Sequence, residues 1–235
     1  MFISIFVNPT QFGPEEDFEK YPRDFEKDCR LAEKAGVDYV FHPCPKSMYR
    51  HVFSTFVQVK GLDNIMCGRN RPGHFMGVCT VVLKLFNIIK PDIAFFGQKD
   101  YQQLMILKKM TQDLNLDVNI VAGETIREKD GLALSSRNKY LDPDQRKNAA
   151  VLYKSLKLAE NILKNGMGAE KARKEAMGLL KTNKFIKKID YLDIRDAESL
   201  EKIVDAECKS DILIAAAVWV DNTRLIDNII SRSKV

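Results

Sequence analysis

Short apolar runs alternate with helical periodicities along the first half of the chain. The run from Phe2 to Val7 ends abruptly at Asn8-Pro9, a pattern that predicts a strand buried on both faces of a parallel sheet. A helical periodicity follows from Phe25 to Ala32, and Gly36 stands where a C-terminal helix cap belongs. Val37 to Phe41 predicts a second strand, so this region has the order of a β-α-β unit.

The alternation continues in the next segments. Apolar residues from Phe75 to Ile89 share one face of a predicted helix, and Ile93 to Phe96 predicts a short strand. A helix from about Tyr101 carries Leu114 on its apolar face, and Val118 to Val121 predicts a further strand. Strands and helices in this alternation are typical of a parallel α/β sheet.

The pattern changes in the second half. A helix is predicted to begin at Asp142-Pro143, and a second helix follows the break at Gly166-Met167-Gly168. Two strand-like segments come last, Ile189 to Ile194 and Ile212 to Val220. Two helices followed by two strands predict a small α+β domain.

Chain length agrees with this division. The 235 residues, of which 45% are hydrophobic and 29% charged, suit a globular protein with one large domain or two modest ones. With the change of pattern near Thr125, we predict domains at residues 1–125 and 126–235.

Net charge and cysteine content narrow the range of possible functions. A net charge of +5 suits an anionic ligand, and no dense Lys/Arg block with aromatic residues indicates nucleic acid binding. No run reaches membrane-spanning length, and the N-terminal apolar run lacks the basic flank of a signal peptide. Five cysteines without a CxxC pair predict free thiols, no metal site and a cytoplasmic location.

The segment Gly97-Gln98-Lys99-Asp100 follows the predicted strand that ends at Phe96. Ligands of parallel sheets gather at the carboxyl ends of strands, and a following helix directs its N-terminal N–H groups there. Lys99 suits a phosphate, and Asp100 suits ribose hydroxyl groups. The alternative, which the tetrapeptide alone favours, is a turn with Asp100 as helix cap and Lys99 in solvent.

A second candidate segment is Leu134-Ser135-Ser136-Arg137-Asn138. Two hydroxyl groups beside an arginine can bind phosphate oxygens, because a guanidinium group contacts them in pairs. The alternative is a surface loop whose serines cap a helix.

Three further polar residues follow predicted strand ends or open helices. Gln11 and Gln103 suit the hydroxyl and carboxylate groups of a small polar acid, although single glutamines are usually surface residues. We expect His74, at the start of a helix, to have a structural or supporting role. The chain has no GxSxG, Walker A, HExxH or GxGxxG motif.

Together these segments resemble the pantothenate synthetase family in order and spacing, over essentially the whole chain. The segments that carry the resemblance are Phe6 to Pro14, Arg71 to Phe75, Phe96 to Gln103, Arg127 to Asn138, Asp190 to Leu192 and Asn222 to Asn228. The resemblance implies a Rossmann-like nucleotidyl-transferase domain with a smaller C-terminal α+β lid domain, in a homodimer. It also implies a reaction in which pantoate and Mg²⁺-ATP form pantoyl adenylate and pyrophosphate, after which β-alanine displaces AMP.

The resemblance also assigns residues. It implies pantoate binding by Gln11 and Gln103, with Gln11 also near β-alanine. Phosphate stabilisation and catalysis fall to Lys99, Ser135, Ser136 and Arg137. The implied nucleotide contacts are Gly97, Gln98, Lys99, Asp100, Ile126, Leu134, Ser135, Ser136 and Arg137, with Gln98 standing where some relatives carry Glu.

One family feature has no counterpart here. The family begins with a strand and a Pro-Thr-Met-Gly loop that leads to a His-x-Gly-His motif, whereas this chain starts at what resembles the family's second strand. We expect an N-terminally shortened record, which the upstream in-frame DNA would test, and an unpaired edge on the first strand. An inactive remnant with weak ligand binding is one alternative. A different nucleotidyl transferase is another, against which Gln11 and Gln103 argue.

Overall fold

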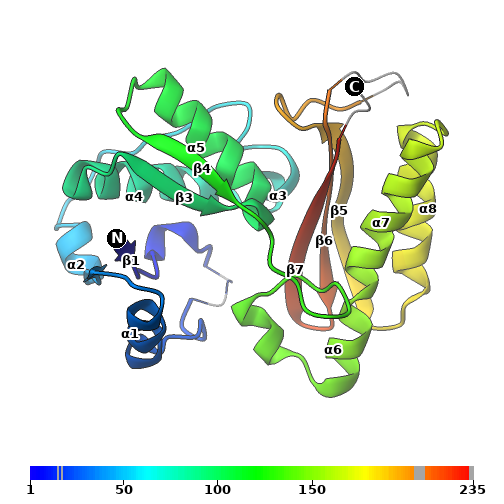
Figure 1. Ribbon diagram of the computed structural model, residues 1–235, viewed down its shortest axis with the longest axis horizontal. Helices are drawn as coiled ribbons and strands as arrows, with labels where there is room; N and C mark the ends of the chain where they lie inside the picture. The colour runs from blue at the N-terminus through cyan, green and yellow to red at the C-terminus, as the bar shows by residue number, and fades with distance from the viewer. Residues whose placement is uncertain (15, 17, 204–209, 233–235) are drawn as a thin grey trace.

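The computed structural model describes residues 1–14, 16, 18–203 and 210–232. Cys208 lies outside these residues. The first part of the chain contains two parallel strand pairs, of which Figure 1 shows β3 beside β4. Strand β1 (Phe2–Ser4) pairs with β2 (Tyr39–Phe41), and β3 (Ile93–Gly97) pairs with β4 (Asn119–Gly123). The helices of this part are η1 (Pro9–Gln11), α1 (Phe25–Lys34), α2 (Pro45–Met48), α3 (Met66–Asn70), α4 (His74–Ile89), η2 (Gln98–Asp100) and α5 (Tyr101–Asp113).

The core of the first part lies where α4 and α5 pack together. Val78 and Cys79 of α4 meet Ile106, Leu107 and Met110 of α5, and all five are almost completely buried. These residues form the apolar faces that the helical periodicity predicts. The two helices therefore hold the carboxyl end of β3 and its following loop on a rigid base.

Two details of the sequence prediction are wrong here. Only Phe2–Ser4 of the predicted Phe2 to Val7 segment forms a strand, and Phe2 and Ile3 are 46% and 38% exposed rather than buried on both faces. The reason is that β1 pairs along one edge with β2, and no other described strand pairs with it. Leu114 is exposed, because α5 ends one residue before it.

The second part is a three-stranded antiparallel sheet covered on one face by helices (Figure 1). The strand order is β5-β6-β7, and α7 and α8 pack on the sheet through a core that includes Leu152, Leu156 and Ile214. The opposite face contacts α3 and η2 of the first part. The elements are η3 (Ser136–Tyr140), α6 (Pro143–Ala149), α7 (Val151–Lys164), α8 (Ala169–Thr182), β5 (Ile186–Asp196), β6 (Ile212–Val220) and β7 (Thr223–Ser231).

The second part also departs from the sequence prediction in two ways. The helix predicted from Asp142-Pro143 is two helices that meet at Ala150, the first of which opens with an Asp142–Gln145 capping box. The sheet has a third strand, β7, which the periodicity did not indicate because it buries the polar residues Asp227 and Asn228. Over the described part of the chain, no helix has the length and hydrophobicity needed to cross a membrane.

Candidate active site

A cavity of ≈ 70 Å³ lies between the two parts of the chain. Lys99, Asp100 and Gln103 line it from the first part, and Ser135 and Arg137 line it from the second. The structure thus brings together five residues that the sequence analysis singled out separately. Pockets for drug-sized ligands occupy roughly 300–1,000 Å³, so a ligand as large as ATP would extend beyond this cavity or require its lining to shift.

Lys99 is held at the wall of the cavity and not in solvent. It belongs to the single turn η2 between β3 and α5, and its side chain is 21% exposed. Its Nζ lies 3.8 Å from the Asp100 carboxylate. Asp100 occupies the N-cap position of α5, but its carboxylate makes no capping hydrogen bond. Both charged groups therefore remain available to a ligand.

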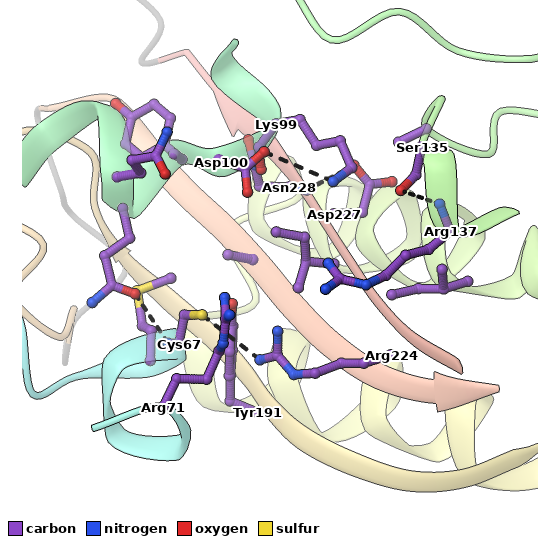
Figure 2. A pocket seen from close by; sticks show the side chains of 18 of the residues that line it. Cys67, Arg71, Lys99, Asp100, Ser135, Arg137, Tyr191, Arg224, Asp227 and Asn228 are labelled. Atoms are coloured by element: carbon purple, nitrogen blue, oxygen red, sulfur yellow. Dashed lines mark hydrogen bonds and ion pairs between the residues drawn. The ribbon is translucent and has the colours of Figure 1, made fainter. Parts of the chain in front are cut away.

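Asn228 ties this loop to the second part (Figure 2). Its side-chain amide donates to the backbone carbonyl oxygens of Gln98 at 3.0 Å and Lys99 at 2.7 Å. The neighbouring Asp227 accepts two hydrogen bonds from Arg127, at 2.7 and 2.9 Å. Burial raises the pKa of Asp227, although the charge and hydrogen bonds of Arg127 oppose that effect. Strand β7 therefore sets the position of the Lys99 loop.

Two buried acceptor atoms at the cavity have no hydrogen-bond partner among the described residues. They are the Oδ1 atoms of Asn138 and Asn228, and both residues line the cavity. Because buried polar atoms are nearly always paired, a water molecule or a ligand donor is needed to complete them.

The Ser135 to Arg137 segment combines capping with a place at the cavity. Ser135 Oγ accepts a hydrogen bond from the Arg137 amide at 3.3 Å, as a helix cap does. The Arg137 guanidinium lies over the Tyr21 ring at 5.6 Å. Ser136 does not line the cavity, and its hydroxyl lies 3.4 Å from that of Tyr21. Ser136 therefore lies outside the cavity, whereas its neighbours Ser135 and Arg137 line it.

Four further residues of the implied nucleotide site lie outside the cavity lining. Gly97 and Gln98 precede Lys99, and Gln98 contributes the carbonyl that Asn228 binds. Ile126 and Leu134 are joined by a backbone hydrogen bond of 2.9 Å, and their side chains are 65% and 51% exposed. These two side chains form an apolar surface that no described residue covers fully.

Gln11 does not line the cavity, but its backbone is held by residues that do. Its carbonyl oxygen accepts hydrogen bonds from Arg71 at 3.1 Å and from His74 Nδ1 at 2.8 Å. Burial, and then the charge of Arg71, lowers the pKa of His74 to about 4. The ring is neutral at pH 7, so its Nε2 accepts from Arg71 at 3.0 Å. This arrangement agrees with the supporting role expected for His74.

The sequence analysis assigned no role to three other residues of the cavity. Cys67 comes from α3, Tyr191 from β5 and Arg224 from β7. The available signal for Tyr191 and Arg224 was that they lie in the segments Asp190 to Leu192 and Asn222 to Asn228, which resemble the family's C-terminal domain.

Comparisons with known proteins agree on one family. The sequence matches the family described as "Pantoate-beta-alanine ligase" over residues 1–230. It is 56% identical to the pantothenate synthetase of Caldicellulosiruptor saccharolyticus, over 97% of this chain and 80% of that protein. It is 54% identical to the pantothenate synthetase of Thermotoga petrophila, over 97% of this chain and 81% of that protein.

Solved structures give the same result. A crystal structure of pantothenate synthetase from Thermus thermophilus superposes with a TM-score of 0.92 at 43% identity, and covers 97% of this chain and 82% of that one. The Francisella tularensis pantoate-β-alanine ligase, crystallised with βγ-ATP and β-alanine, has a TM-score of 0.76 at 32% identity. That match covers 98% of this chain and 78% of the other.

Proposed function

The chain belongs to the pantoate-β-alanine ligase family, and we propose that its cavity is where the carboxylate of pantoate is adenylated. As a member of that family it binds ATP and joins pantoate to β-alanine. The observation that carries the proposal is that Lys99, Ser135 and Arg137 come from two parts of the fold to one cavity. This is the combination of fixed positive charge and hydrogen-bond donors that an adenylation site needs.

The reaction has two steps. A carboxylate oxygen of pantoate attacks the α-phosphorus of ATP, the bond to the β-phosphate bridging oxygen breaks, and pyrophosphate leaves. The β-alanine nitrogen then attacks the acyl carbon and loses a proton, and the bond from that carbon to the AMP oxygen breaks. Negative charge gathers on the phosphate oxygens in the first step. Lys99 and Arg137 offset this charge, and the Ser135 hydroxyl donates to it.

Substrate recognition divides between the two glutamines. Gln103 lines the cavity on the first turn of α5 and can bind the hydroxyl groups of pantoate. Gln11 has the same proposed role, and its backbone carbonyl oxygen is held by hydrogen bonds from Arg71 and His74. Its side chain reaches the cavity only if the turn at Pro9–Gln11 adjusts when substrate binds.

The nucleotide contacts are proposed on the same basis. Gly97, Gln98 and Asp100 surround Lys99 and can contact the ribose and phosphates, while Ile126 and Leu134 offer exposed apolar surface to the adenine ring. Ser136 would join them only if the loop that carries it closes on the phosphates.

Mg²⁺ fits this site as a companion of ATP. Among the described residues, no group of three His, Cys, Asp or Glu side chains could hold a metal alone. Mg²⁺ is commonly held by one or two carboxylates together with substrate phosphates, and Asp100 supplies one carboxylate that makes no capping hydrogen bond. When bound, the ion would offset phosphate charge. The domain division at residues 1–125 and 126–235, the homodimer and the cytoplasmic location stay predictions.

The test replaces Lys99 with methionine and follows pyrophosphate and AMP release with each substrate omitted in turn. Lys99→Met should lower kcat by about 10²- to 10³-fold, the loss typical for one preorganised group that stabilises transition-state charge. Lys108→Met, on the exposed face of the adjacent α5, is the matched control and should leave kcat unchanged. If Lys99→Met retains full activity, or if release does not require pantoate, the proposal is wrong.

A further inference from the structure

Arg224 is anchored at one edge of its guanidinium group. Its Nε donates to Asp190 Oδ2 at 2.7 Å, and its side chain is 15% exposed. Asp190 is fixed in turn, because its other oxygen accepts from the Trp219 indole at 3.0 Å. The pKa of Asp190 is lowered because, although burial acts to raise it, the hydrogen bond and charge of Arg224 outweigh burial. Arg224 is therefore charged and held in one orientation.

The other edge of the same guanidinium group is almost without partners. Nη2 lies 3.8 Å from the Cys67 sulfur, a long and weak contact, and Nη1 donates to no described residue. Arg71, at the same cavity, differs: Glu16, Gln11 and His74 all contact its guanidinium group. A charged donor at the cavity wall without acceptors among the described residues is suited to an anionic ligand.

Tyr191 is a second donor at the same place. Its hydroxyl makes no hydrogen bond to any residue that the structure describes, although the residue lines the cavity. Burial, and then the nearby Cys67, raises the pKa of the Tyr191 phenol, so the hydroxyl keeps its proton at neutral pH. Figure 2 shows Tyr191, Cys67 and Arg224 together on one side of the cavity, with Lys99 and Ser135 on the other.

We propose that Arg224 and Tyr191 form the subsite for the carboxylate of β-alanine. A guanidinium edge with two free N–H directions matches the two oxygens of a carboxylate, and the phenol adds a third hydrogen bond. Cys67 lies close to both side chains, with its sulfur 3.8 Å from Nη2 of Arg224. Arg224 and Tyr191 line the same cavity as Lys99 and Ser135, so a group bound between them would share that space with the reacting groups.

The choice of β-alanine over pantoate rests on the proposed function. The carboxylate of pantoate is the reacting group, so it must lie beside the α-phosphate at the Lys99 side. The carboxylate of β-alanine does not react and remains in the product. Repulsion from the AMP phosphate places it away from Lys99, and Arg224 offers the compensating charge. The subsite thus turns the amine nitrogen toward the acyl carbon.

The experiment compares β-alanine with 3-aminopropan-1-ol, the amine of the same length that carries a hydroxyl group in place of the carboxylate. Two variants are used, Arg224→Met and Tyr191→Phe, with Arg173→Met on the exposed surface of α8 as matched control. We expect Arg224→Met to lower kcat/KM for β-alanine about 100-fold, the effect of losing charge-assisted hydrogen bonds. The preference for β-alanine over the alcohol should shrink by the same factor. Pantoate-dependent pyrophosphate release and the KM of pantoate should stay unchanged.

Tyr191→Phe removes one oxygen atom and should lower the same preference about 5- to 10-fold, which keeps the test valid if Arg224→Met fails to fold. Saturation-transfer NMR with β-alanine alone adds a measurement that needs no turnover, and Arg224→Met should lose that signal. An unchanged preference in both variants, or a rise in the KM of pantoate in place of β-alanine, overturns the inference. Failure of the proposed function is distinguishable, because the wild-type chain would then release no pantoate-dependent pyrophosphate.

Discussion

Replacing Asn228 with alanine tests whether β7 positions the Lys99 loop. The side-chain amide of Asn228 makes two hydrogen bonds to consecutive carbonyl oxygens of that loop, and the residue is 4% exposed. The substitution removes both hydrogen bonds and leaves a cavity-lining position empty. It touches neither the Lys99 side chain nor the hydroxyl and guanidinium groups opposite.

The magnitude follows from the two hydrogen bonds. Each is worth about 0.5–1.5 kcal/mol net, so their loss weakens the attachment of the loop by about 1–3 kcal/mol. If the reacting complex needs the loop in its attached position, kcat/KM for ATP falls by about 5- to 150-fold. The free energy of unfolding should fall by a similar amount, because the same contacts join the two parts of the fold.

The assay measures pantoate-dependent pyrophosphate release at varied ATP, together with urea unfolding of the same samples. Asn228→Asp is a second variant of nearly the same volume, in which a carboxylate faces the two carbonyls and cannot donate to them. It should lose at least as much activity as Asn228→Ala. Asn165→Ala, at an exposed helix end with no side-chain partner among the described residues, is the matched control and should match wild type.

One result would refute this reasoning. If Asn228→Ala loses unfolding free energy but keeps its kcat/KM for ATP, the contacts stabilise the fold without positioning the loop. An unchanged free energy of unfolding would mean that the two hydrogen bonds do not persist in solution.

Two further substitutions test other contacts. Gly77→Ala places a methyl group against the Thr10 carbonyl, so we expect it to lower the free energy of unfolding by about 1–3 kcal/mol and to raise the KM of pantoate. Its control, Gly178→Ala on the open surface of α8, should leave the free energy of unfolding unchanged or raise it by up to ~1 kcal/mol. Glu16→Gln should destabilise the fold at neutral pH, because the hydrogen bond and charge of Arg71 outweigh burial and lower the pKa of Glu16 from 4.5. The ionised pair stabilises fully above pH 4.5 and is lost as pH falls through the folded-state pKa, so urea unfolding should show the wild type and Glu16→Gln converging in acid; a constant difference would contradict this assignment.

The long helices α1, α4 and α5 were predictable because their apolar residues repeat at helical spacing, whereas the short helices α2 and α3 were not predicted. Phe75 to Ile89 and the helix after Asp100 occur where the periodicity places them. Strand β7 was not predictable in that way, since its buried face carries Asp227 and Asn228, whose partners Arg127 and the Lys99 loop are about 100 residues or more away in sequence. Pairing over such separations leaves no local pattern.

The residues of the candidate site also differ in whether the local sequence could predict them. Lys99 and Arg137 could be found because each stands in a short polar segment whose residue types suit phosphate binding. Arg224 could not, because its role depends on which of its N–H groups other residues leave unpaired. The supporting part of His74 could be expected from its place at a helix start, but its contact with the Gln11 carbonyl depends on tertiary packing.

Oxygen transfer from pantoate to AMP tests the central claim most directly. Pantoate labelled with ¹⁸O in its carboxylate is turned over with ATP and β-alanine, and the AMP and the amide product are analysed by mass spectrometry. If the carboxylate attacks the α-phosphorus, AMP gains one ¹⁸O atom and the amide retains the other. AMP without the label, formed in a reaction that still needs pantoate and β-alanine, would contradict adenylation of pantoate in this cavity.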